Sequence, residues 1–175
     1  MKDKKSNSVT FLKYGFYLKR LSFFQYFALS TLISFQVFFL AVDYFHFNID
    51  LTYLKVGSFI VLWWLPLISS VANSFRNLYF SLFWLFICSL WIFVDFTPIF
   101  NVLPLFTFGF IHVSRIIFKL IFQKEPVFLI VSRFELHNFD KIERRKSNRI
   151  DFIFSMITFI LGTALPFLLF YFDII

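Results

Sequence analysis

Apolar residues occupy five long stretches of this chain, and short polar segments separate them. The stretches cover residues 21–42, 55–73, 77–94, 97–114 and 152–172. Each is close to the roughly 20 residues that a helix rising about 1.5 Å per residue needs to cross the ~30 Å hydrocarbon core of a bilayer. The pattern therefore predicts an all-α fold, a polytopic bundle of about five membrane-spanning helices.

Charged residues between the stretches are distributed unevenly. Sixteen of the 17 Lys and Arg residues lie before the first stretch, in the second connection, or between residues 115 and 149, and the exception is Lys55. The other connections carry Asp43, Asp50 and Asp95. Because Lys and Arg are retained on the cytoplasmic side during insertion, five crossings place the N-terminus inside and the C-terminus outside. A segmentation into four or six spans breaks this segregation.

These boundaries divide the chain into four parts. They are a basic N-terminal tail (1–20), four transmembrane helices (21–122), a basic cytoplasmic-side connection (123–151), and a fifth transmembrane helix with a short tail (152–175). Within the connection, Asp140 to Glu143 and Asn148 to Asp151 both have the spacing of a helix cap. Either pair is a candidate start for the last helix.

Composition supports the membrane assignment and removes several kinds of chemistry. The 175 residues are 59% hydrophobic and 15% charged, and 32 of them are Phe, whereas a soluble fold of this size needs a more polar exterior. A single cysteine, Cys88, excludes an internal disulfide and a multi-cysteine metal site. No Asp or Glu lies inside a stretch, which disfavours ion-coupled transport. Because Gly-rich phosphate loops and HExxH are also missing, we expect no cofactor and no metal.

The segment GFIHVSRIIFKLIFQK, residues 109–124, places charges directly after the fourth stretch. On a helix, His112, Arg115, Lys119 and Gln123 fall on one face. Arg115 is close enough to the membrane surface to extend into the headgroups, and such a face attracts anionic lipid at ~1 kcal/mol per base. The predicted lipid- or partner-binding residues are His112, Arg115, Lys119, Arg144, Arg145 and Arg149. The alternative is that these bases only determine topology.

Small and hydroxyl residues recur on one side of the last stretch. The predicted helix-packing residues are Ser155, Thr158, Gly162 and Pro166, because small residues allow close helix contact in a membrane. The stripe is either a seam inside this chain or an interface with another subunit. In the second stretch, Pro66 is expected to bend the helix.

Three functions remain open. The first is a structural or accessory subunit of a larger membrane complex, without catalytic residues of its own. The second is a small transporter or channel component, motivated by Pro66, Asn101 and Pro104. The third is a membrane enzyme acting on a lipid phosphate near His112, Arg115 and His137. The expected partners are a bilayer with anionic inner-leaflet headgroups and other membrane subunits, with no nucleic acid. The expected location is a bacterial inner membrane or a eukaryotic organelle membrane.

Overall fold

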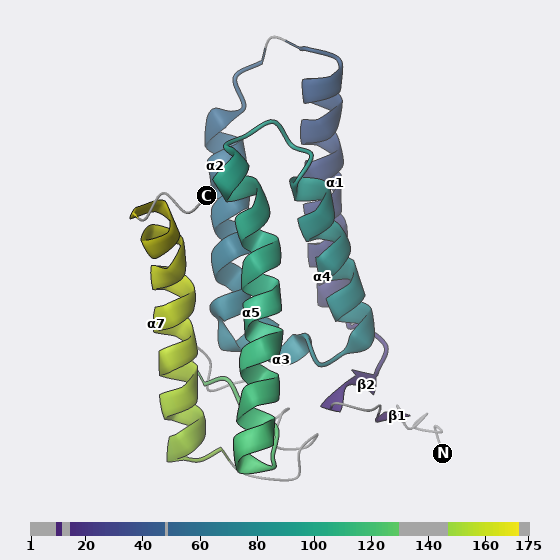
Figure 1. Ribbon diagram of the computed structural model, residues 1–175. Helices are drawn as coiled ribbons and strands as arrows, with labels where there is room; N and C mark the ends of the chain where they lie inside the picture. Colours follow the sequence, from purple (N-terminus) through teal and green to yellow (C-terminus); the bar gives the residue numbers. More distant parts are fainter. Residues whose placement is uncertain (1–9, 12–14, 48, 130–146, 172–175) are drawn as a thin grey trace, which may run out of the picture.

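A computed structural model describes residues 10–11, 15–47, 49–129 and 147–171, and it confirms the all-α fold (Figure 1). The only strands in these ranges are the two-residue, antiparallel β1 and β2. The elements are β1 (Thr10–Phe11), β2 (Tyr17–Leu18), α1 (Phe23–Tyr44), α2 (Thr52–Trp64), the 3-10 helix η2 (Leu65–Leu67), α3 (Ser69–Ser74), α4 (Leu78–Trp91), α5 (Pro98–Phe122) and α7 (Arg149–Tyr171).

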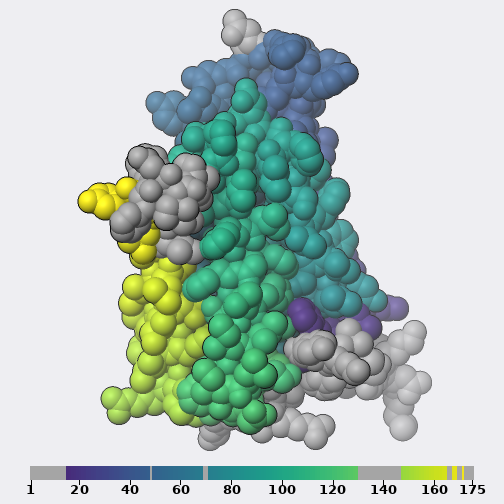
Figure 2. All heavy atoms as spheres, viewed as in Figure 1, coloured from purple at the N-terminus to yellow at the C-terminus, as the bar shows by residue number. Residues whose placement is uncertain are grey.

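The long helices run up and down along one common direction (Figure 1). Helix α5 lies centrally and packs against α2, α4 and α7, whereas α1 packs mainly on α4. Figure 2 shows α7, α5 and α4 side by side on one face of the molecule. We call the end of the bundle that holds Lys55 the Lys55 end, and the opposite end, where α5 finishes, the Arg115 end.

The second predicted stretch is broken at Pro66. Helix α2 ends at Trp64, Pro66 lies in η2, and Ile68 is extended with ψ 137° before α3 begins. Proline has no N–H to donate and its ring crowds the preceding turn, so a helix bends or breaks there. Here the expected bend is a complete interruption, with extended backbone at Ile68, two positions after Pro66. Pro104, by contrast, lies within the continuous helix α5.

The starts of the last two helices follow local sequence signals. Pro98 is the first residue of α5, although the side chain of Thr97 before it makes no capping hydrogen bond. The Asp151 N–H donates to Asn148 Oδ1 over 3.0 Å, and the Asn148 N–H donates to Asp151 Oδ2 over 3.0 Å. This reciprocal cap selects the second of the two predicted starts for α7.

The bundle is apolar outside as well as inside. Trp84, Trp91 and Phe39 are fully buried, while Phe23 and Phe24 at the start of α1 are 80% and 82% exposed. Among the described residues, two helices are long and apolar enough to cross a membrane, Phe23–Tyr44 and Pro98–Phe122. The apolar segments Thr52–Leu67 and Leu78–Trp91 are shorter. The five crossings and their orientation stay predictions.

Candidate functional site

The basic face of α5 is turned toward the protein at the Arg115 end. Arg115 on α5 and Arg76, at the corner between α3 and α4, are each 2% exposed. Between them lies Glu125, whose Oε2 is 3.9 Å from Arg115 Nε and 4.0 Å from Arg76 Nε. Its Oε1 is 2.7 Å from Lys119 Nζ. We call Arg76, Arg115, Lys119 and Glu125 the arginine cluster. One buried carboxylate thus holds three cations, two from α5 and one from the corner between α3 and α4.

A short N-terminal segment, residues 15–19, covers this cluster, and we call it the N-terminal strap. The Gly15 carbonyl accepts a hydrogen bond from Arg76 Nε over 3.0 Å. The Phe16 ring centroid lies 4.3 Å from Arg115 Cζ, and the Tyr17 ring lies 5.7 Å from Arg76 Cζ. A buried guanidinium needs acceptors or ring faces in place of water. The strap supplies both.

His112 lies one turn before Arg115 and contacts Ser81 on α4. Its Nε2 is 3.3 Å from Ser81 Oγ, and Ser81 Oγ donates a hydrogen bond to the Phe75 carbonyl over 2.7 Å. A serine nucleophile must direct its proton to the histidine. Ser81 donates its single hydroxyl proton to the Phe75 carbonyl instead, so His112 Nε2 is the donor in its bond with Ser81. His112 therefore ties α5 to the start of α4, with the Phe108 ring 4.6 Å away.

The chain that follows α5 is buried without being helical. Residues Glu125 to Phe128 are buried, and polar side chains of α3 and α7 bond their backbone. Val127 N–H donates to Asp151 over 3.1 Å, Phe128 exchanges two bonds with Asn73 over 3.1 and 3.2 Å, and Leu129 N–H donates to Ser155 over 3.0 Å. Buried backbone groups must be paired. Three side chains pair these backbone groups, as a neighbouring strand would in a sheet.

The predicted binding residues separate into three groups. His112, Arg115 and Lys119 come together, but Arg115 reaches Glu125 and Phe16 inside the protein instead of the headgroups. Arg149 is exposed in the first turn of α7. Arg144 and Arg145 lie outside the described residues, as does His137. Lipid or partner binding by these residues stays a prediction.

The predicted packing stripe of α7 faces the interior of this chain. Ser155 and Thr158 are buried, and Ser155 Oγ donates to the Val127 and Asp151 carbonyls. At Gly162 an added Cβ would overlap the side chain of Leu67 in η2. Pro166 lies outside the residues whose side chains are described. Sequence reasoning missed these partners of the stripe, because they come from η2 and the chain after α5.

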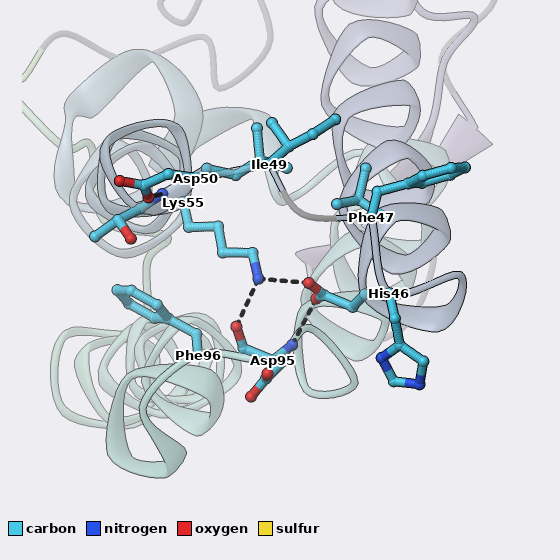
Figure 3. Close-up of a pocket in the computed structure, with 11 residues that line it drawn as sticks. His46, Phe47, Ile49, Asp50, Lys55, Asp95 and Phe96 are labelled. Atoms are coloured by element: carbon cyan, nitrogen blue, oxygen red, sulfur yellow. Dashed lines mark hydrogen bonds and ion pairs between the residues drawn. The ribbon is translucent and has the colours of Figure 1, made fainter.

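A cavity of about 570 Å³ lies at the Lys55 end (Figure 3). Lys55 Nζ donates to Asp43 Oδ1 and to the Asp95 carbonyl, both over 2.7 Å, and the Asp95 N–H donates to Asp43 Oδ2 over 2.9 Å. Figure 3 shows the Lys55 side chain pointing across the cavity toward Asp95. This clamp joins α1, α2 and the turn between α4 and α5.

The rest of the cavity is lined partly by exposed loop residues, among them His46 and Asp50. Asp50 accepts hydrogen bonds from Thr52, one of them from its N–H over 3.0 Å, and these bonds lower the pKa of the Asp50 carboxyl below its usual value. His46 has a left-handed backbone, with φ 52°. Within the described ranges, no group of three or more His, Cys, Asp or Glu side chains is placed to hold a metal ion.

Comparison of the chain with models of protein families, with curated proteins and with solved structures finds no match.

Proposed function

We propose that this chain is an integral membrane protein with five crossings, its N-terminus inside and its C-terminus outside. The observation that carries the proposal is the presence of two polar layers, one at each end of the bundle. The Lys55 clamp forms one layer, and the arginine cluster with Asp151 forms the other. Helix α5 rises about 26 Å from Pro98 to Arg115, close to the ~30 Å of a hydrocarbon core.

The surface between these layers supports lipid contact. In the most apolar 18-residue windows of α1 and α5, only 22% of the residues are buried, whereas the core helix of a soluble protein is mostly buried. The exposed apolar side chains on α1, α4 and α5 include Phe38, Phe86 and Ile117. A soluble monomer rarely exposes so continuous an apolar surface. Lipid is the environment that such a belt requires.

Within the membrane, we propose the role of a structural or accessory subunit of a larger complex. Helix α1 packs mainly on α4, and its outer side carries a groove of about 350 Å³. The groove is lined by Phe27, Ser30, Thr31, Ser34, Phe35 and Phe38. Exposed hydroxyl groups at helical spacing are typical of contacts between membrane helices, so a transmembrane helix of a partner subunit fits here.

The Arg115 end adds an electrostatic contact with the bilayer. Arg20 and Arg149 are exposed at this end, on the side that the distribution of bases assigns to the cytoplasm. Each base near an anionic leaflet contributes ~1 kcal/mol. Anionic inner-leaflet headgroups are therefore the lipid partners that we propose for this end.

Two experiments test the proposal. Reporters fused to the N-terminus and after Asp173 should appear on opposite sides of the membrane, and alkaline carbonate should not release the chain. Purified in mild detergent from its native membrane, the chain should migrate in a complex well above its own 21.1 kDa. Both reporters on one side would refute five crossings, and a single monodisperse monomer would refute the subunit role.

A further inference from the structure

The N-terminal strap is fastened to a single corner of the bundle. Tyr17 N–H donates to the Arg76 carbonyl over 2.9 Å, and Asn77 Nδ2 donates to the Lys19 carbonyl over 2.7 Å. With the bond from Arg76 Nε to Gly15, these three hydrogen bonds all end on two consecutive residues between α3 and α4. Figure 1 shows β2, the middle of the strap, beside the lower end of α4. These three bonds can therefore break together when the strap lifts.

The strap covers both buried guanidinium groups with three consecutive residues. The Phe16 ring lies on Arg115, and the Tyr17 ring and the Gly15 carbonyl lie on Arg76. A carbonyl oxygen and the negative face of a ring attract a cation, but less strongly than an anion does. When these three residues leave, both guanidinium groups lose the contacts that the strap provides, while the Glu125 carboxylate stays between them.

The strap lies directly against the carboxylate of the arginine cluster. Gly15 has φ +77°, and a Cβ at this position would overlap the Glu125 carboxylate, which Lys119 holds over 2.7 Å. Only a glycine allows the strap to approach Glu125 this closely. Because its paired strands are two residues long, it belongs to the part of a fold that opens at low free-energy cost.

We propose that the strap is a displaceable cover over Arg76 and Arg115, and that the ligand taken up when it lifts is the phosphate of an anionic lipid headgroup. This inference rests on the proposed membrane location, because α5 brings Arg115 to headgroup depth. A guanidinium binds phosphate oxygens with two parallel hydrogen bonds, which a ring face and one carbonyl cannot match. Binding of the lipid and closure of the strap exclude each other.

Hydrogen exchange at the Tyr17 amide measures the position of the strap, because this N–H is bonded to Arg76 only when the strap is closed. The full chain is placed in lipid nanodiscs of phosphatidylcholine, alone or mixed with phosphatidylglycerol. Exchange should be roughly fivefold faster with phosphatidylglycerol, as expected for the loss of one backbone hydrogen bond. Equal exchange in both membranes overturns the proposal. Inorganic phosphate added to phosphatidylcholine discs should change nothing, and an equal acceleration by it overturns the lipid assignment.

Two matched variants separate the specific site from general surface charge. Arg115→Lys keeps the charge and loses the two-pronged geometry, so it should abolish the response to phosphatidylglycerol while the helical circular dichroism is retained. Arg149→Lys changes an exposed base at the same end and should leave the response intact. A normal response in Arg115→Lys, or its loss in Arg149→Lys, overturns the proposal. Release of the chain by alkaline carbonate refutes the membrane location itself, whereas an embedded chain with lipid-independent exchange refutes only the strap.

Discussion

Replacing Lys55 by Met should loosen the Lys55 end of the bundle, because this one ammonium group joins three segments. The side chains of Lys55 and Asp43 are 11% and 20% exposed, so the pair is neither fully buried nor solvated. Breaking a fully buried pair costs about 3–5 kcal/mol, and exposed pairs contribute about 0.2–1 kcal/mol. The intermediate burial, together with the lost bond to the Asp95 carbonyl, places the expected loss of stability at about 2 kcal/mol.

Equilibrium unfolding in mixed micelles, followed by circular dichroism, measures this loss. Combining Lys55→Met with Asp43→Asn in a double-mutant cycle isolates the pair, and the coupling energy should be about 1–2 kcal/mol. Asp50→Asn is the matched control, because Asp50 lines the same cavity, bonds Thr52 instead of Lys55, and an Asn side chain can accept the same bond from the Thr52 N–H. Its unfolding midpoint should move much less than that of Lys55→Met, because Asp50 is exposed and its charge is screened by solvent. A Lys55→Met midpoint equal to that of the wild type would show that the clamp contributes nothing to folding.

Three further changes test other parts of the structure. In a thermal unfolding assay, Gly162→Ala should destabilise the fold by about 1–3 kcal/mol, because the new Cβ overlaps Leu67. Gly57 lies in α2 with open space around it, so in the same assay Gly57→Ala should be neutral or stabilising by up to about 1 kcal/mol. Asp151→Ala removes the acceptor for two backbone N–H groups and should cost about 2–4 kcal/mol, and a loss below about 1 kcal/mol would contradict its role. The lowered pKa of Asp50 means that its stabilising contribution is present above the pKa of about 3.9 in the unfolded chain and is lost as the pH falls through the lower folded value. Amide exchange at the start of α2 should therefore accelerate only at acid pH, and Asp50→Asn should remove this dependence.

The sequence by itself predicts the helices well, because each one is specified by residues that are neighbours in the chain. Five apolar stretches appear as helical segments, and Asn148 and Asp151 form the cap that their spacing predicts. The break near Pro66 also has a local cause, the missing N–H of proline. That the helix is fully interrupted there, and not merely bent, is not explained by the local sequence. The environment of the Arg115 side chain cannot be predicted in the same way. Helical spacing correctly groups it with His112 and Lys119, but spacing does not decide whether that face meets lipid or protein.

Only the tertiary structure decides what the polar groups contact. Glu125 turns the basic face of α5 inward, and the strap that covers it comes from residues about 100 positions earlier in the sequence. Asn73, Asp151 and Ser155 bond one buried segment from two helices that are also far apart along the chain. Hydrophobic periodicity shows which residues share a face of one helix. It carries no information about which distant side chain meets a given face, because that depends on how all the helices pack together.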